Sequence, residues 1–222
     1  MLLLTVVGGP ALADDSQLRF EVAYATFLGG AHWDEAREVI VSADGSALVG
    51  AMVKSGGLPV GKRAFQPKYA GDDPTLGHGG QFGGDCYLLH LGPEGQTVRA
   101  GTYFGGSKQE RNVYGMAQDA AGNVVITSST RSTGIPTTEG AFQRKIGGGV
   151  NDIIFAKHAP KLDLLDWCTY LGGKNGDTPR GGLALTREGR VTIVGSSNSP
   201  DFPTTKGALQ RELKPGGDAI VT

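Results

Sequence analysis

Carboxylates recur beside paired glycines, and they are the first residues whose type and spacing could do chemistry. Asp34, Glu35, Glu110 and Asp177 follow successive Gly-Gly pairs at similar offsets. A ring of carboxylates beside backbone carbonyls could bind Ca²⁺, which takes about six to eight oxygen ligands. The spacing contains no Asp-x-Asp-x-Asp loop, so we expect these side chains to cap turns or face solvent. A Ca²⁺ site that uses Asp34 and Asp177 is the alternative.

A second set of carboxylates opens one strand of each repeat. Asp85, Asp152 and Asp218 occupy a single equivalent position. A carboxylate there can accept hydrogen bonds from the backbone N–H groups of a neighbouring loop. We therefore expect a structural role for these residues, with metal ligation as the alternative.

Other reactive side chains form no recognisable constellation. The four histidines, His32, His78, His90 and His158, are scattered and lack zinc-ligand spacing. Neither a Gly-x-Ser-x-Gly motif nor a Walker loop occurs, and the glycine pairs recur once per repeat, which is typical of turns. Trp33 could stack on a sugar. No specific motif in the sequence predicts a catalytic residue, a cofactor site or a metal site.

The elements that position these residues belong to an internal repeat. The segments Thr-Tyr-(Phe/Leu)-Gly-Gly, Gly-Ala-(Phe/Leu)-Gln and Gly-Gly-Asp or Asn-Asp return in the same order along the chain. Gly106 and Gly173 are 67 residues apart, and so are Asp85 and Asp152. The first repeat is longer because of an insertion around 70–82.

Each repeat contains four strand-like runs. In the second repeat these are 113–118, 124–128, 153–157 and 164–170, and the first two are joined by a short turn that contains Gly122. Four antiparallel strands in a repeat of this length fit one blade of a β-propeller. The sequence thus predicts an all-β fold with about three blades' worth of strands in an incomplete ring.

The ordered motifs resemble the bacterial β-propeller repeats known as SBBP (seven-bladed β-propeller) repeats. The resemblance covers essentially all of the chain after residue 13, although the first repeat has Leu58-Pro59-Val-Gly-Lys where the family has Phe-Pro-Thr-Thr. It implies extracytoplasmic, often cell-surface proteins and implies no catalytic residues. The predicted organisation is a signal peptide at 1–13 and repeats over 14–222, divided into an orphan fourth strand at 18–30 and blades at 31–104, 105–171 and 172–222 (partial).

Counted this way, the chain starts with a fourth strand and stops within a third. We interpret it as a fragment of a longer chain, whose remainder would close the ring. The alternative is a second copy that completes the ring as a head-to-tail dimer. A strand at the N-terminus is what such a closure by strand exchange requires.

Composition points to an exported protein rather than a nucleic-acid or membrane protein. The apolar start ends in Ala11-Leu-Ala13 before two aspartates, as a secretory signal does, and a buried strand is the alternative. With 21 basic and 22 acidic residues there is no basic stripe to bind phosphates, so we expect no nucleic-acid partner. No later segment is apolar enough to insert in a membrane. The expected location is secreted, periplasmic or cell-surface.

Strand order places the longer connections of every repeat at one end of the sheets. We expect this loop-rich rim to be the binding surface. Its candidate residues are Trp33, Asp34, Glu35, Asp72, Asp73, His78, Glu110 and Asp177. The predicted function is a non-catalytic binding or structural module whose partner is a protein or a polysaccharide. The alternative is a catalytic propeller, a polysaccharide lyase or glycosidase, with carboxylates on this rim.

Overall fold

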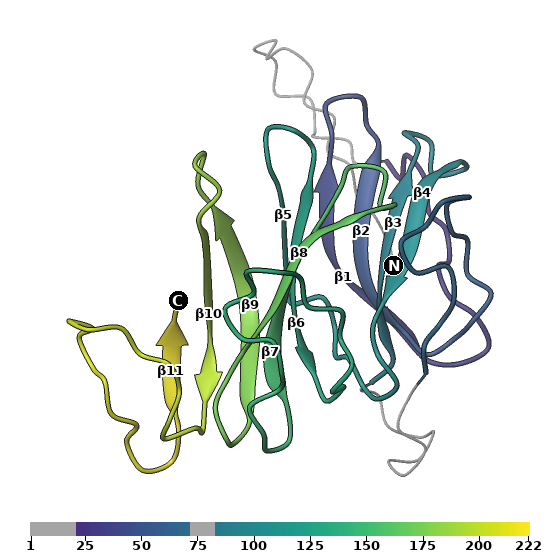
Figure 1. The fold of residues 1–222 in the computed structure, drawn as a ribbon. Helices are drawn as coiled ribbons and strands as arrows, with labels where there is room; N and C mark the ends of the chain where they lie inside the picture. Colours follow the sequence, from purple (N-terminus) through teal and green to yellow (C-terminus); the bar gives the residue numbers. More distant parts are fainter. Residues whose placement is uncertain (1–20, 72–82) are drawn as a thin grey trace.

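The computed structural model describes residues 21–71 and 83–222, and this part of the chain is all-β (Figure 1). It contains three antiparallel sheets and no helix. The strands are β1 (Asp34–Val41), β2 (Ala47–Val53), β3 (Asp85–Leu91), β4 (Val98–Phe104), β5 (Gly115–Gln118), β6 (Val124–Thr130), β7 (Asp152–His158), β8 (Leu165–Leu171), β9 (Asp177–Leu185), β10 (Val191–Ser197) and β11 (Asp218–Val221).

Each sheet is a meander in which consecutive strands are neighbours. The first sheet has the order β1-β2-β3-β4, the second β5-β6-β7-β8, and the third contains β9, β10 and β11. The strands expected in the second repeat are confirmed as β5–β8. Equivalent strands keep the same register: Tyr87 of β3 faces Tyr103 of β4, and Ile154 of β7 faces Tyr170 of β8.

The hairpin between the first two strands of each sheet turns at a glycine. Gly45, Gly122 and Gly189 have φ values of 81°, 83° and 83°. This left-handed conformation strains residues with a Cβ atom, so the recurring glycine of the sequence has a direct physical cause. The predicted turns are therefore confirmed.

Successive sheets pack face to face. β1 contacts β5, and β5 contacts β9, so the first strands of the three sheets lie next to one another. One core lies between the first and second sheets and includes Phe104 and Ile126, and another joins Phe155 of the second sheet to Ile193 of the third. β2 and β6 are buried along their whole length, which explains their continuous runs of small and apolar residues.

The long connection between the second and third strands does not remain a free loop. In the first sheet it returns along the outer edge of β4, where Gly61 N–H donates to Gly101 O and Tyr103 N–H donates to the Gln66 carbonyl. In the second sheet Tyr170 N–H donates to Gln143 O in the same way. The binding rim expected from the sequence includes these connections, but part of each one protects a sheet edge.

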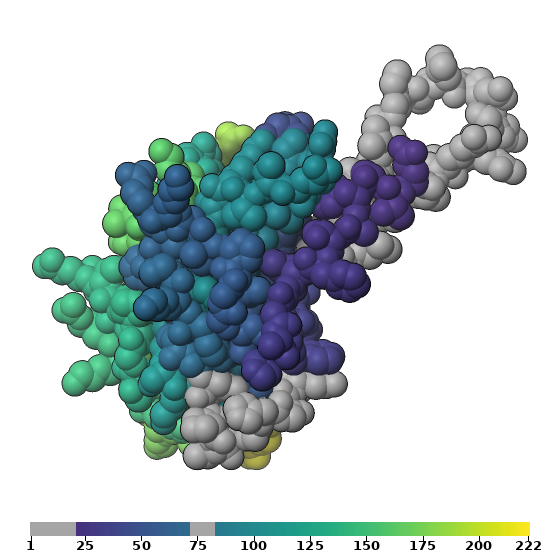
Figure 2. All heavy atoms as spheres, turned by 90° about the vertical axis from the view of Figure 1, so that its right-hand side faces the viewer, coloured from purple at the N-terminus to yellow at the C-terminus, as the bar shows by residue number. Residues whose placement is uncertain are grey.

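The orphan strand predicted at 18–30 is not formed in the structure. Residues 18–20 lie outside the described residues, and residues 21–30 contain no strand. The segment lies instead against the first sheet, as the purple atoms in Figure 2 show. Strand structure needs a hydrogen-bonding neighbour, and no sheet edge pairs with this segment.

Candidate functional site

The carboxylates that follow the Gly-Gly pairs clamp their own turns. Gly30 N–H donates to Asp34 Oδ2 (2.6 Å), Gly106 N–H to Glu110 Oε2 (2.8 Å), and Gly173 N–H to Asp177 Oδ2 (2.8 Å). The second oxygens of two of them also bind within the chain: Lys54 N–H donates to Asp34 Oδ1, and the Thr130 hydroxyl to Glu110 Oε1. Turn capping, the role expected from the sequence, is confirmed for Asp34, Glu110 and Asp177, whereas Glu35 binds the side chains of Arg37 and Asn112 instead.

A serine completes each turn. The Oγ atoms of Ser55, Ser132 and Ser199 accept hydrogen bonds from the backbone N–H groups of His32, Lys108 and Asn175 at 3.0–3.1 Å. These serines come from the segment after the second strand of the sheet that the turn enters. These serines are not among the residues predicted from the sequence, although their recurrence at one position of the repeat is a usable signal.

The strand-opening aspartates bind the neighbouring loop as predicted. Asp85 Oδ2 accepts from Ala70 N–H (2.7 Å), Asp152 Oδ2 from Gly147 N–H (2.7 Å), and Asp218 Oδ2 from Lys214 N–H (2.7 Å). These backbone donors account for the carboxylate at this position of every repeat.

A glutamine that was not predicted to have a role binds each of these aspartates, and in the first two repeats it also binds the next turn. In the second repeat the Gln143 side chain donates through Nε2 to Asp152 Oδ2 (3.1 Å) and to Lys145 O (2.9 Å). Its Oε1 accepts from Gly172 N–H (3.1 Å) at the Gly-Gly pair. Gln66 does the same in the first repeat. The invariant glutamine of the three motifs was the signal for this role.

Two pairs of carboxylates are buried where neighbouring sheets meet. Asp85 faces Glu110 across Gly105, because a methyl group on Gly105 would touch both Asp85 Oδ1 and Glu110 Oε2. Burial raises the pKa of Asp85 to about 8, with the charge of Glu110 adding to the effect. Burial likewise raises the pKa of Asp152 to about 6, with a contribution from Asp177. The Oδ1 atoms of all three aspartates have no hydrogen-bond partner within the part of the chain that the structure describes.

Asp85 and Asp152 have the raised pKa of a general acid but not its access to substrate. Asp85, Glu110, Asp152 and Asp177 are fully buried. A catalytic carboxylic acid must reach the proton acceptor on the substrate. The arrangement is therefore suited to holding a proton between two sheets rather than to transferring one to a substrate.

The predicted rim residues are not brought into one site. Asp34, Glu110 and Asp177 belong to three different sheets or to the connections that enter them, and each binds the backbone of its own turn. Glu35 binds Arg37 and the Asn112 side chain. In residues 21–71 and 83–222 no group of three or more His, Cys, Asp or Glu side chains could hold a metal ion.

Of the remaining rim candidates, Trp33 is the one that lies among the described residues. Its side chain is 49% exposed in the turn before β1. Asp72, Asp73 and His78 lie outside the described residues. An exposed indole at a turn can contact a sugar ring or an apolar side chain of a partner.

The histidines and cysteines have core roles where they are buried. His158 packs edge-on between the rings of Phe65 and Phe104, at centroid distances of 5.7 and 5.1 Å. Burial lowers its pKa to about 4, so the ring is neutral at physiological pH. Cys86 and Cys168 are free and buried in the same core.

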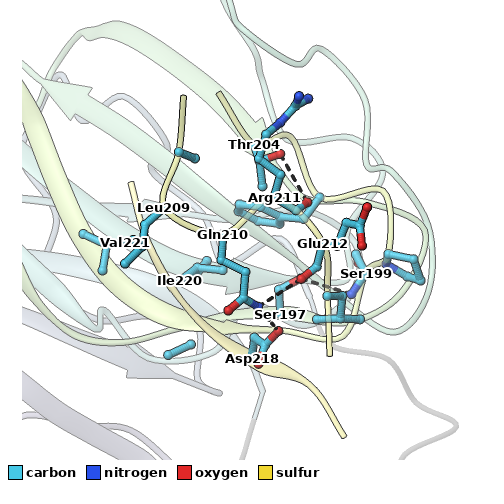
Figure 3. A pocket seen from close by; sticks show the side chains of 15 residues that line it. Ser197, Ser199, Thr204, Leu209, Gln210, Arg211, Glu212, Asp218, Ile220 and Val221 are labelled. Carbon is cyan, nitrogen blue, oxygen red and sulfur yellow. Dashed lines mark hydrogen bonds between the residues drawn. The ribbon is translucent and has the colours of Figure 1, made fainter. Parts of the chain in front are cut away.

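The third sheet leaves an open groove beside β11. Its volume is about 420 Å³, and the segment 198–213 forms its other wall (Figure 3). Leu209 and Val221 are exposed there, at 106% and 75%. No strand pairs with the second edge of β11 among the described strands, so the groove combines apolar side chains with free backbone groups.

Comparison with known proteins gives no family. No protein-family model matches the sequence, and no curated protein matches it. The described part of the chain contains no helix that is long and apolar enough to cross a membrane.

Proposed function

We propose that the three sheets are consecutive blades of a β-propeller and that the chain is an exported, non-catalytic binding or structural module. The observation that carries the proposal is the recurrence of one polar clamp. In each repeat a carboxylate, a serine and a glutamine are committed to the turns and loops that join the strands. Residues used in this way build the repeat and are not available to act on a substrate.

The packing of the sheets supports the blade arrangement. In a propeller, sheets of four antiparallel strands are repeated radially, with the first strands closest to the central channel. The contacts of β1 with β5 and of β5 with β9 are those of adjacent inner strands. A cryo-electron microscopy or crystal structure of the assembled protein tests this. Sheets stacked along a line without a common axis would contradict it.

Export rests on residues 1–13, which lie outside the described residues. An apolar segment that ends in Ala-Leu-Ala fits cleavage before Asp14. The test is the mass of the protein recovered from the periplasm or medium of an expressing bacterium. A mature chain that begins at Asp14 supports the proposal, whereas an uncleaved cytoplasmic chain contradicts it.

Binding through the loop-rich rim is tested most directly at Trp33. We expect Trp33→Ala to weaken binding to a polysaccharide or protein partner by about tenfold or more, since a buried aromatic contact contributes on the order of 1–3 kcal/mol. Leu164→Ala is the matched control, because Leu164 is 59% exposed in the hairpin at the opposite end of the second sheet. A glycan array and a partner pull-down with both variants separate a binding module from a structural spacer. Equal losses in the two variants would contradict the rim assignment.

A further inference from the structure

We propose that the protein has a second binding site, for an acidic carbohydrate, at the junction of the first two sheets. The site, called here the cationic groove, has a volume of about 520 Å³ and is lined by residues 59–63, 98–100, 161 and 163. We expect its ligand to be a chain of uronic acids that is held through its carboxylate groups. The proposal rests on the proposed binding function for the class of partner, a polysaccharide, and not on the rim.

The cationic groove lies at the end of the sheets opposite the rim. β4 begins there at Val98, and the hairpin 159–164 between β7 and β8 reaches the same end (Figure 1). Trp33 precedes β1 at the other end, because β1 runs toward the hairpin at 42–46. The groove thus has three walls: the connection of the first sheet, the start of β4 and the hairpin of the second sheet.

Basic side chains dominate this groove. One acidic residue, Asp163, lines it together with four of the 21 basic residues of the chain. The four are Lys62, Arg63, Arg99 and Lys161. The whole chain has a net charge of −1, so the excess of positive charge is local. Such a local excess in a groove attracts an anion to this part of the surface.

The repeat does not account for these charges. Gln66 corresponds to Gln143, and Thr102 to Thr169, so each basic residue has a counterpart in the other repeat. The counterparts of Lys62, Arg63, Arg99 and Lys161 are Glu139, Gly140, Asp166 and Glu94. Three of the four positions therefore have the opposite charge in the other repeat. The third repeat has a lysine, Lys206, at the first position. The clamps require the same residues in every repeat, whereas the set of four basic residues is particular to this junction.

The hairpin that carries Lys161 is held against the first sheet in a strained conformation. Leu162 has a φ of 55°, in the left-handed region that disfavours bulky residues, and its counterpart Gly95 has a φ of 68°. The Leu162 side chain is fully buried between the first two sheets, and its carbonyl accepts from Phe65 N–H (3.0 Å). Backbone strain of this kind persists where the surrounding structure fixes it, and it is concentrated at functional sites. The wall at 161–163 is therefore fixed before a ligand binds, which lowers the cost of binding.

The two arginines of the groove already bind carboxylates. Arg63 Nη2 lies 3.4 Å from Asp163 Oδ2, and Arg99 Nη1 donates to Asp44 Oδ2 (2.7 Å). A guanidinium group has five N–H donors, so one carboxylate does not use all of them. Both pairs are open to solvent, since the side chain of Arg63 is 77% exposed and that of Asp44 is 50% exposed. Such pairs contribute little stability, so the carboxylate of a ligand can share the arginine donors or replace the internal partner.

The two lysines add charge that no carboxylate of the described chain neutralises. Neither Lys62 nor Lys161 forms an ion pair within residues 21–71 and 83–222, and both residues are exposed. They come from two different walls, so a ligand that lies along the groove meets one lysine from each sheet. An ammonium group is a compact charge on a flexible stem, which suits repeated carboxylates at variable positions.

Other classes of anion fit the groove less well. An extended peptide adds to a free sheet edge, but the edge of β4 is occupied here by Gly61, whose N–H donates to Gly101 O. Single-stranded nucleic acid needs aromatic side chains on which its bases stack, and none of the described residues that line the groove is aromatic. A sugar acid needs charged groups beside small apolar surfaces, and Pro59, Val60 and Val98 supply the latter.

The test is calorimetric titration of the 222-residue chain with de-esterified oligogalacturonate, in which every sugar carries a carboxylate. The matched neutral ligand is the fully methyl-esterified oligomer, which has the same rings and no charge. We expect the first to bind and the second not to bind. The affinity for the first should fall as salt is raised from about 20 to about 200 mM, because salt screens exposed charges. Equal binding of the two oligomers, or binding of neither, would overturn the proposal.

Charge reversal locates the site. Lys62→Glu and Lys161→Glu introduce the charges that Glu139 and Glu94 have in the other repeat, and each should lower the affinity about fivefold or more, because an attractive exposed pair becomes repulsive. Lys206→Glu is the matched control, since it changes the net charge equally at the equivalent exposed position of the third repeat, outside the groove. We expect it to leave the affinity unchanged, and we expect all three variants to unfold in urea as the wild type does. An equal loss of affinity in Lys206→Glu would show that net charge alone is recognised and would overturn the proposal.

Two further titrations separate this proposal from binding at the rim and from binding of a peptide. Trp33→Ala should bind oligogalacturonate as the wild type does, because Trp33 lies at the other end of the sheets. If Trp33→Ala abolishes binding and Lys62→Glu does not, the ligand occupies the rim, and the cationic groove is rejected while the proposed function stands. A poly-glutamate peptide of the same charge should bind more weakly than oligogalacturonate, and equal affinity would reject the carbohydrate as the ligand class.

Discussion

Replacing Asp85 by asparagine should stabilise the protein by an amount that depends on pH. The folded-state pKa of Asp85 is raised from 3.8 to about 8, because the carboxyl group is buried and faces Glu110. Between these two values the folded chain keeps a proton that the unfolded chain releases. The free energy of unfolding therefore falls as pH rises through this window, by at most about 1.4 kcal/mol per pH unit from this one group.

Asparagine removes this titration and keeps the geometry. Its oxygen can accept from Ala70 N–H and Gln66 Nε2, as Asp85 Oδ2 does. Its amide group can then take the place of Oδ1, which faces Glu110 and has no partner in the described structure. From pH 4.5 to 7.5 the gain in stability from Asp85→Asn should rise by about 2–4 kcal/mol, allowing for incomplete burial of the charge.

Urea unfolding followed by circular dichroism at several pH values measures this change. Asp152→Asn is the graded comparison, because the pKa of Asp152 is raised only to about 6. Its gain should stop growing near pH 6, whereas the gain of Asp85→Asn continues to about pH 8. If Asp85→Asn destabilises the protein equally at pH 4.5 and 7.5, the facing carboxyl groups are not the source of the shift and the reasoning is refuted.

Four further substitutions test the packing and the clamps. The pKa of His158 is lowered from 6.5 to about 4, so the wild-type protein should lose stability as pH falls from 6.5 to 4, by up to about 3 kcal/mol. His158→Leu should remove this loss in urea unfolding at pH 5 and 7.5. Gln143→Ala should lower the free energy of unfolding by about 2–4 kcal/mol, because Gln143 binds both Asp152 and the fourth strand's turn. Gln210 has no fourth strand beside it in the described sheet, so Gln210→Ala should lower the free energy of unfolding by less than half of that. Equal losses in the two variants would contradict the clamp. Leu162→Ala should cost about 3 kcal/mol in thermal or urea unfolding, because this side chain is fully buried between the first two sheets.

The strands could be predicted from the sequence because the information was local and repeated. The second repeat has four apolar runs, and a glycine turn between the first two predicts a hairpin there. In the structure Gly122 forms this turn with a φ of 83°. The same reasoning failed for residues 21–30, which have the composition of a strand but no neighbouring edge in the described chain. Strand structure depends on a partner that may be distant in sequence, and composition alone does not say where that partner is.

The polar roles could be predicted only in part, for a related reason. A carboxylate after Gly-Gly indicated a capped turn because the acceptor and its donor are four residues apart, as in Gly106 and Glu110. The role of Gln143 was missed because its partners are Asp152 and Gly172, and the latter is 29 residues away. The pairing of Asp85 with Glu110 was missed because it requires two sheets to meet.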